Sequence, residues 1–70
     1  MASVNANMAG TVLDVLVKAG DTVSEGMDVV CIESMKMQMF IAAEQGGTVK
    51  EIKVGAGDFV NEGDTLIVLE

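Results

Sequence analysis

Residues 10–33 read GTVLDVLVKAGDTVSEGMDVVCIE, and residues 47–70 read GTVKEIKVGAGDFVNEGDTLIVLE. The two segments align without a gap at an offset of 37 residues, and 11 of the 24 aligned positions are identical. A repeat at fixed spacing indicates that one supersecondary unit is used twice. Two copies are too few for a solenoid, so we expect one closed domain over residues 1–70 with an internal pseudo-twofold axis. Residues 34–46 are then the connection between the two halves.

The composition of both halves is typical of strands and turns, because Val, Ile, Leu and Thr dominate and Gly punctuates them. No segment shows a sustained apolar period of 3.6 residues, so we expect no substantial helix. The sequence predicts an all-β domain with an edge strand near Ser3–Ala6. It predicts further strands at Thr11–Val17, Thr22–Val23, Asp28–Glu33, Met37–Ala42, Thr48–Val54, Phe59–Val60 and Thr65–Leu69.

The apolar residues of the second long strand depart from strict alternation. They lie at Val49, Ile52 and Val54, a spacing of three and then two, and the first copy has valine at all three matching positions. This spacing predicts a β-bulge in each long strand. Val12 and Val49, and likewise Val15 and Ile52, are expected to be equivalent buried residues.

Two leucines align with lysines in the repeat. Leu13 and Leu16 stand where the second copy has Lys50 and Lys53, so they are expected to face water. They could form a docking patch or cover the N-terminal strand, and we favour the second role.

Each half also contains a Gly-Asp pair, Gly20-Asp21 and Gly57-Asp58. Gly permits a positive φ, and Asp accepts hydrogen bonds from nearby backbone N–H groups. Neither loop is followed by the helix and Lys-Ser/Thr of a phosphate-binding loop, so we interpret both as structural turns.

Charge and composition exclude several classes of function. The net charge is −7 and the chain contains no arginine, which argues against nucleic acid and against anionic membrane surfaces as partners. Without histidine and with Cys31 as the single cysteine, neither a zinc site nor an internal disulfide is expected. Cys31 is interpreted as a small buried apolar residue. No apolar run reaches transmembrane length and no signal peptide is evident, so the expected location is the cytoplasm.

The segment Glu33-Ser34-Met35-Lys36-Met37-Gln38 lies between the two repeats. Strands are expected on both sides of it, so a β-hairpin with Lys36 at or beside its tip is the simplest connection. Hairpin tips favour Asn-Gly or Gly, and Met-Lys is poor turn chemistry. A local rule that is broken at one place often marks a functional site.

Of the four lysines, only Lys36 lies outside the repeats. An exposed lysine amine is mostly protonated and is a poor base, and no histidine or convergent pair of acids accompanies it. We therefore expect no catalytic residue, but an amine well suited to acylation by another enzyme. The flanking Met35 and Met37 suit the pocket of a partner, although they could instead fold back onto the sheet.

Glu33-Ser34-Met35-Lys36-Met37 resembles the Glu-Ala/Ser-Met-Lys-Met motif of biotinyl domains, the family of biotin carboxyl carrier proteins and biotin/lipoyl attachment proteins. The resemblance covers nearly the whole chain. It implies a flattened, eight-stranded barrel-sandwich of two four-stranded antiparallel sheets with pseudo-twofold symmetry. It also implies that Lys36 on an exposed hairpin carries covalent biotin, with Met35, Met37, Ser34 and Glu33 as recognition residues. Glu33 aligns with Glu70, which no lysine follows, so a structural role at a strand end is equally open.

The resemblance further implies a non-catalytic, monomeric carrier. A biotin protein ligase would transfer biotin from biotinyl-adenylate to Lys36, and the biotin would then be carboxylated at a biotin carboxylase site and carried to a carboxyltransferase. A lipoyl carrier or a dual biotin/lipoyl attachment protein is the alternative, although lipoyl hairpins usually carry Asp-Lys-Ala. A second alternative is an unmodified protein-interaction module with the same fold.

Overall fold

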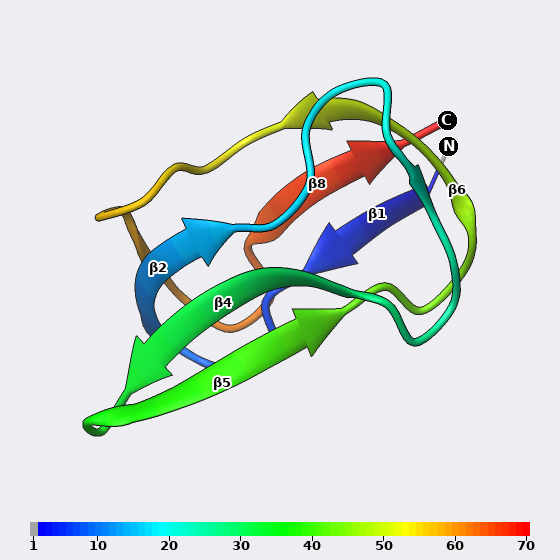
Figure 1. Cartoon of the computed structure of the whole chain (residues 1–70). Coiled ribbons are helices and arrows are strands. Elements are labelled where there is room, and N and C mark those ends of the chain that lie inside the picture. Colours follow the sequence, from blue (N-terminus) through cyan, green and yellow to red (C-terminus); the bar gives the residue numbers. More distant parts are fainter. Residues whose placement is uncertain (1) are drawn as a thin grey trace.

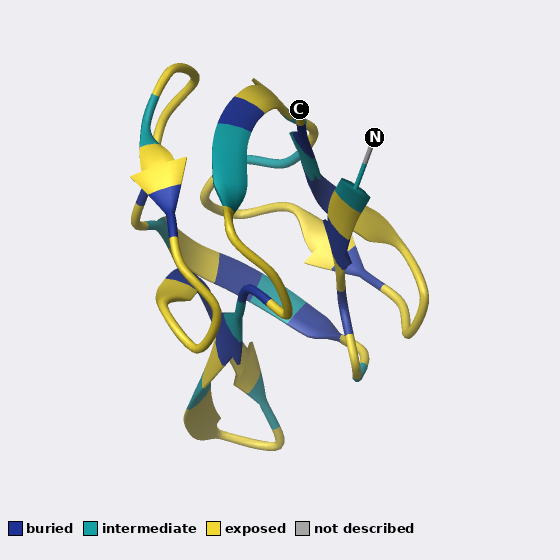
Figure 2. Cartoon of the chain, turned by 90° about the vertical axis from the view of Figure 1, so that its right-hand side faces the viewer, coloured by how far each residue is buried: buried dark blue, intermediate teal, exposed yellow. Residues whose placement is uncertain are grey.

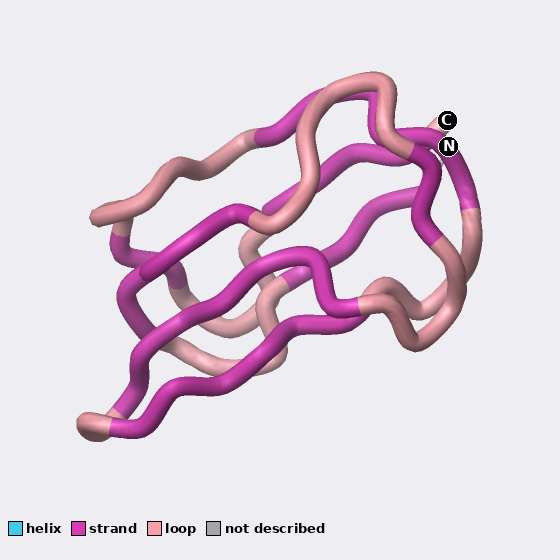
Figure 3. Tube along the Cα trace, in the orientation of Figure 1, coloured by secondary structure: helices cyan, strands magenta, loops and turns pink. Residues whose placement is uncertain are grey.

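The structure, a computed structural model, describes residues 2–70, and Met1 of the expected domain lies outside the described residues. The described chain consists of strands and connecting loops, as Figure 3 shows. It contains no helix that is long and apolar enough to cross a membrane. The eight strands are β1 (Ala2–Asn5), β2 (Gly10–Val15), β3 (Thr22–Val23), β4 (Asp28–Ser34), β5 (Met37–Ala42), β6 (Gly47–Ile52), β7 (Phe59–Val60) and β8 (Thr65–Leu69).

The strands form two four-stranded sheets, one in the order β1-β8-β6-β3 and the other in the order β5-β4-β2-β7. Every pairing is antiparallel. The predicted all-β fold of two four-stranded antiparallel sheets is therefore confirmed (Figure 1). The two long strands end at Val15 and Ile52, two residues earlier than the sequence predicts.

A shift of 37 residues maps one sheet onto the other. It takes β2 to β6, β3 to β7 and β4 to β8, and it also takes β1 onto the last four residues of β5. The structural correspondence thus extends beyond the aligned halves, because residues 39–46 are the counterpart of residues 2–9. In that stretch only Ala6 and Ala43 are identical, and both are buried. Within the described chain, only residues 34–38 have no structural mate.

The loops repeat the symmetry in their hydrogen bonds. The N–H of Lys18 donates to Asp21 Oδ2, and the N–H of Gly55 donates to Asp58 Oδ2, each at 2.9 Å. Gly20 and Gly57 have φ values of 96° and 95°, which residues with a Cβ rarely adopt. The interpretation of both Gly-Asp pairs as structural turns is confirmed.

Each long strand contains the predicted bulge. In β2 the register against β4 shifts between Val12 and Asp14, so Leu13 is the extra residue. In β6 the register against β8 shifts between Val49 and Glu51, so Lys50 is the extra residue. The bulge explains why the apolar spacing changes from two to three residues in both copies.

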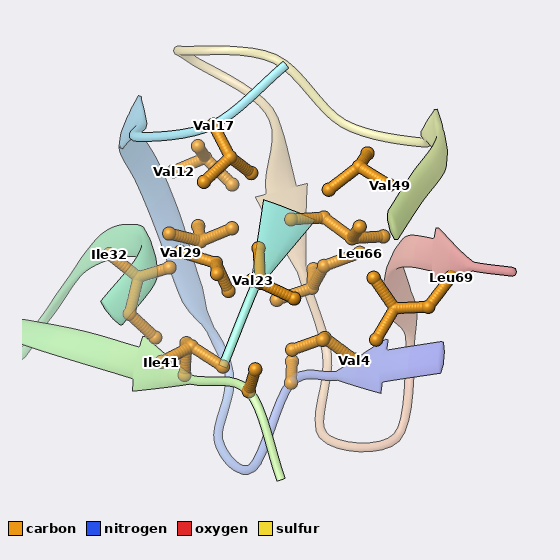
Figure 4. Close-up of a cluster of buried hydrophobic side chains, with 14 of the residues drawn as sticks. Val4, Val12, Val17, Val23, Val29, Ile32, Ile41, Val49, Leu66 and Leu69 are labelled. Atoms are coloured by element: carbon orange, nitrogen blue, oxygen red, sulfur yellow. The ribbon is translucent and has the colours of Figure 1, made fainter. Parts of the chain in front are cut away.

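The core lies between the two sheets and consists of aliphatic side chains (Figure 4). The mates Val12 and Val49 are 1% and 2% exposed, which confirms that they are equivalent core residues. Val15 and Ile52 are also equivalent, but they are half-buried and pack against the edge of the core. No described charged or polar side chain is buried, so burial of apolar surface stabilises this domain. Figure 2 shows that exposure is concentrated in the turns and the hairpin.

Leu13 and Leu16 face water, as expected from their alignment with the lysines, and are 36% and 45% exposed. The favoured role for them, covering the N-terminal strand, is wrong. That strand is β1, which pairs with β8 at the edge of the opposite sheet, whereas both leucines belong to β2 and the loop after it.

Candidate functional site: the hairpin between β4 and β5

The hairpin between β4 and β5 projects from one end of the domain (Figure 1). Its last pair joins Ser34 to Met37, so the turn consists of Met35 and Lys36 alone. Ala2 and Leu69, which pair with each other, lie at the other end. The pseudo-twofold axis relates β4 to β8 and β5 to β1. The turn that joins β4 to β5 is therefore equivalent in position to the chain ends at β8 and β1, and the two lie at opposite ends of the domain.

The turn has an unusual backbone for its residue types. Met35 and Lys36 have φ values of 54° and 65°, and they are the only described residues other than glycine with positive φ. Two-residue hairpins of type I′ require positive φ at both central positions, which is why Asn-Gly is common there. For a residue with a Cβ, this conformation costs about 1–2 kcal/mol. The hairpin therefore holds a methionine and a lysine at its tip against the local preference of the backbone.

The side chains at the tip extend into solvent. Met35 is 90% exposed and Met37 is 61% exposed, so the alternative that they fold back onto the sheet is wrong and their expected exposure is confirmed. Lys36 is exposed, and its amine makes no hydrogen bond or ion pair with any residue from 2 to 70. The next methionine along β5, Met39, does pack against the core. The tip thus presents a free primary amine between two flexible apolar side chains.

The base of the hairpin is fixed by a close approach of β2 to β4. A Cβ on Gly10 would lie 2.6 Å from the backbone oxygen of Glu33, so only glycine fits there. The side chain of Glu33 is exposed and stands opposite Gln38, while Ser34 is half-buried. Glu70, the mate of Glu33, is also exposed. Sequence reasoning missed the role of Gly10, although its identity with Gly47 was a signal for it.

The described residues contain no machinery for catalysis around this amine. They form no pocket, and no group of three or more His, Cys, Asp and Glu side chains is placed to hold a metal ion. Cys31 is buried and unpaired, as expected for a small apolar residue. The exposed primary amine of Lys36 is placed where it can accept an acyl group.

Comparison with known proteins agrees with this arrangement. The biotin/lipoyl family described as "biotin-requiring enzyme" matches residues 2–69. The chain belongs to this family. Domains of the family are non-catalytic carriers of a prosthetic group within enzyme complexes, and this chain is such a carrier domain.

Two curated relatives share about half of their aligned residues with the chain. It is 51% identical to the biotin/lipoyl attachment protein of Bacillus subtilis over 43 residues, which are 61% of this chain and 59% of that protein. It is 53% identical to the biotin carboxyl carrier protein of Streptococcus mutans over 38 residues, which are 54% of this chain and 29% of that protein. The chain thus matches less than two thirds of the length of either relative.

Two solved structures show the same fold. The Kluyveromyces lactis urea carboxylase superposes with a TM-score of 0.91 at 30% identity over 99% of this chain and 6% of that one. The lipoyl domain of the 2-oxoglutarate dehydrogenase complex from Azotobacter vinelandii superposes with a TM-score of 0.74 at 29% identity. That match covers 97% of this chain and 96% of the lipoyl domain. The fold is therefore found both within a protein named urea carboxylase and in a domain named lipoyl domain.

The residues at the tip fit a prosthetic group that is bound through an amide. Such a group needs an accessible amine that is not held by a neighbouring carboxylate, and Lys36 meets this condition. The other three lysines lie elsewhere: Lys18 in the turn after β2, Lys50 at the bulge of β6, and Lys53 in an ion pair with Glu51 at 3.3 Å.

Proposed function

We propose that this chain is a biotin carrier domain and that Lys36 is its attachment residue. The observation that carries the proposal is the unpartnered amine of Lys36, held at the tip of a projecting two-residue turn. The exposed Met35 and Met37 beside it complete the Met-Lys-Met arrangement that biotinyl domains have.

The protein's part in attachment is to supply a nucleophile and hold it within reach. In the active site of a ligase, the amine nitrogen of Lys36 attacks the activated carboxyl carbon of biotinyl-adenylate. The bond from that carbon to the phosphate oxygen breaks, AMP leaves, and the amine loses a proton as the amide forms. Bound biotin supplies a site that accepts and donates a carboxyl group. Because the tether keeps this site close to its partners, the carrier raises its effective concentration at each of them.

The partners proposed for the carrier are a biotin protein ligase, a biotin carboxylase and a carboxyltransferase. The relative named biotin carboxyl carrier protein and the structural match within a urea carboxylase support the carboxylase partners. The acidic chain, with a net charge of −7, suits partners whose binding surfaces are basic.

A lipoyl carrier is the second candidate, because the lipoyl domain of Azotobacter vinelandii has this fold over almost its whole length. The relative from Bacillus subtilis is named for both groups. The tip favours biotin, since lipoyl hairpins usually carry Asp-Lys-Ala and this one carries Met35-Lys36-Met37.

Intact-mass measurement separates the two candidates. The purified chain is incubated in parallel with a biotin protein ligase, biotin and ATP, and with a lipoate protein ligase, lipoate and ATP. We expect the mass to rise by one biotinyl group in the first reaction and to stay unchanged in the second. A gain of a lipoyl group alone would replace biotin by the second candidate, and no gain in either reaction would refute the carrier function.

A further inference from the structure

The exposed large apolar side chains are distributed unevenly over the two sheets. Apart from Met27 in a loop, all of those on residues 2–70 belong to the β5-β4-β2-β7 sheet, its hairpin or the loop that continues β2. Beside the two methionines of the tip, they are Leu13, Leu16, Phe40 and Phe59, with exposures of 36%, 45%, 55% and 65%.

The pseudo-twofold axis supplies an internal control for this distribution. The mates of Leu13, Phe40 and Phe59 in the opposite sheet are Lys50, Ser3 and Thr22, and the mate of Leu16 is Lys53. Equivalent backbone positions are thus polar at all four places on one sheet and apolar on the other. Since the other sheet carries polar residues at the equivalent positions, the backbone geometry of the repeat does not by itself require apolar ones there.

Strand register places the apolar residues on one outer surface. Phe40 stands opposite Cys31, and Cys31 stands opposite Asp14, the residue beside Leu13 in the bulge. Cys31 points outward in this row, yet it is only 7% exposed, so the side chains around it cover it. We call the surface formed by Leu13, Phe40 and Phe59 the apolar face.

Strand register relates the apolar face to the tip of the hairpin, and the polar residues Thr11, Glu33 and Gln38 lie between Phe59 and the edge of the sheet at β5. Phe59 pairs with Thr11, Thr11 with Glu33, and Glu33 with Gln38, so Phe59 lies in the row two residues behind Lys36. At about 3.3 Å per residue along the strands, that row lies roughly 7 Å behind Lys36, and the row of Phe40 lies roughly 13 Å behind it. Phe59 is also displaced sideways from β5 by three strand spacings, roughly 14 Å.

The charge on the strands of this sheet is entirely negative. Strands β2, β4, β5 and β7 carry Asp14, Asp28 and Glu33 and no lysine. The lysines of this half of the chain, Lys18 and Lys36, lie outside its strands, in the loop after β2 and in the turn of the hairpin. A partner that fits the apolar face therefore has its own apolar patch with basic side chains around it.

We propose that the apolar face is the docking surface for the ligase that acylates Lys36; this inference rests on the proposed function. The free lysine has only its own four-carbon side chain with which to reach an active site, so the enzyme that acylates it must come close to the hairpin backbone. A surface that starts two residues behind the tip is then within contact of that enzyme. After acylation the tether is longer, and later partners need not approach the sheet as closely. Phenylalanine is among the aromatic residues that are enriched at the cores of protein interfaces.

The test replaces each residue of the apolar face by its own mate from the opposite sheet, as Leu13→Lys, Phe40→Ser and Phe59→Thr in one chain. The matched control changes the opposite sheet at two mates, as Ser3→Ala and Thr22→Ala. Biotinylation of each purified chain by the biotin protein ligase of the same organism is followed by mass at a range of carrier concentrations. Direct binding of ligase to each unmodified chain gives a second readout that does not depend on turnover.

We expect kcat/KM of the triple variant to fall by at least about tenfold, mainly through KM, with a matching rise in the Kd for ligase. The control should stay within about twofold of the unchanged chain, as changes outside the interface usually do. Thermal unfolding checks that the variant is folded, and Phe59→Thr alone serves if the triple variant is not.

Rising salt should lower kcat/KM of the unchanged chain, and Asp14→Asn should weaken that dependence.

Equal kcat/KM and Kd for the triple variant and the unchanged chain would overturn the docking proposal and leave the proposed function intact. The same holds if only carboxylation of the biotinylated variant is impaired, which would assign the face to a carboxylase component. It also holds if the unchanged chain sediments as a dimer that the variant abolishes, which would assign the face to a second copy. Failure of the unchanged chain to gain biotin at all would instead refute the proposed function, and the docking proposal with it.

Discussion

Two residues at the turn, Met35 and Lys36, hold a backbone conformation that their side chains disfavour. Five consecutive antiparallel pairs run from Val30–Ile41 to Ser34–Met37, and together they force the chain to turn within the next two residues. Because the cost of positive φ is small compared with the stability of this ladder, the hairpin forms despite it. Asn-Gly would suit the backbone of this turn better, but it would not place a lysine amine at the tip.

Replacing the turn by Met35→Asn with Lys36→Gly should therefore stabilise the domain. We expect a gain of about 1–2 kcal/mol in the free energy of unfolding, because Asn and Gly adopt positive φ at little cost. The midpoint of urea unfolding measures it. Lys36→Ala removes the same amine but keeps a Cβ, and it should bring no such gain. Equal stability of both variants would show that the turn is not strained.

The exposed methionines beside the lysine should matter for recognition and not for stability. Met35→Asp with Met37→Ala removes little buried area, and Asp tolerates positive φ, so the melting temperature should not fall. Biotinylation at subsaturating carrier should be slower, because these side chains help to place the amine in the pocket of the ligase. Truncation of the partly buried Met39 to Ala is the matched comparison and should lower the melting temperature. Unchanged biotinylation kinetics of the double variant would remove both methionines from recognition.

At the scale of elements, the close pairing of β2 with β4 positions the hairpin. The absence of a Cβ at Gly10 lets the two strands approach next to Glu33, the residue from which the hairpin extends. The mate Gly47 lies beside Glu70 with slightly more room, since a Cβ there would lie 3.2 Å from the nearest oxygen.

Gly10→Ala should destabilise the domain by roughly 1–3 kcal/mol, because the backbone of β4 has to move away from the new methyl group. Gly47→Ala, at the equivalent position, should cost less. Because Gly10 supports the base of the hairpin, its substitution should also slow biotinylation, whereas Gly47→Ala should not. The free energy of unfolding from urea titration and the rate of mass gain report the two effects. If both variants lost stability equally, the closer approach at Gly10 would not be the cause.

The sequence predicts the strands and both bulges well, because the repeat shows each strand twice with different side chains. Val12 and Val49 keep the core position while Leu13 and Lys50 differ, and this contrast separates buried from exposed positions. The correspondence of β1 with β5 could not be read from the sequence, since Ala6 and Ala43 are the only identical residues there. Poor turn chemistry does predict the site, but the exposure of Met35 and Met37 depends on the register of the hairpin, which sequence alone leaves open.

At the scale of the whole molecule, the pseudo-twofold axis gives most positions a partner in the other sheet. Within the described chain, residues 34–38 have no mate, and they contain the free amine. The other lysines are part of the symmetric body, in a turn, at a bulge or in an ion pair. Duplication thus builds the body of the domain, and the proposed attachment residue lies in the connection between the two copies.

The most direct test of this account is the site of modification. Lys36→Arg keeps the positive charge but removes the acylatable amine, and a chain with Lys18→Arg, Lys50→Arg and Lys53→Arg is its matched control. With biotin protein ligase, biotin and ATP, intact mass should show no biotin on the first chain and one biotinyl group on the second. The first chain should remain folded, because an exposed tip residue contributes little to stability. Biotin on a folded Lys36→Arg chain, or none on the control, would contradict the assignment of Lys36 as the attachment residue.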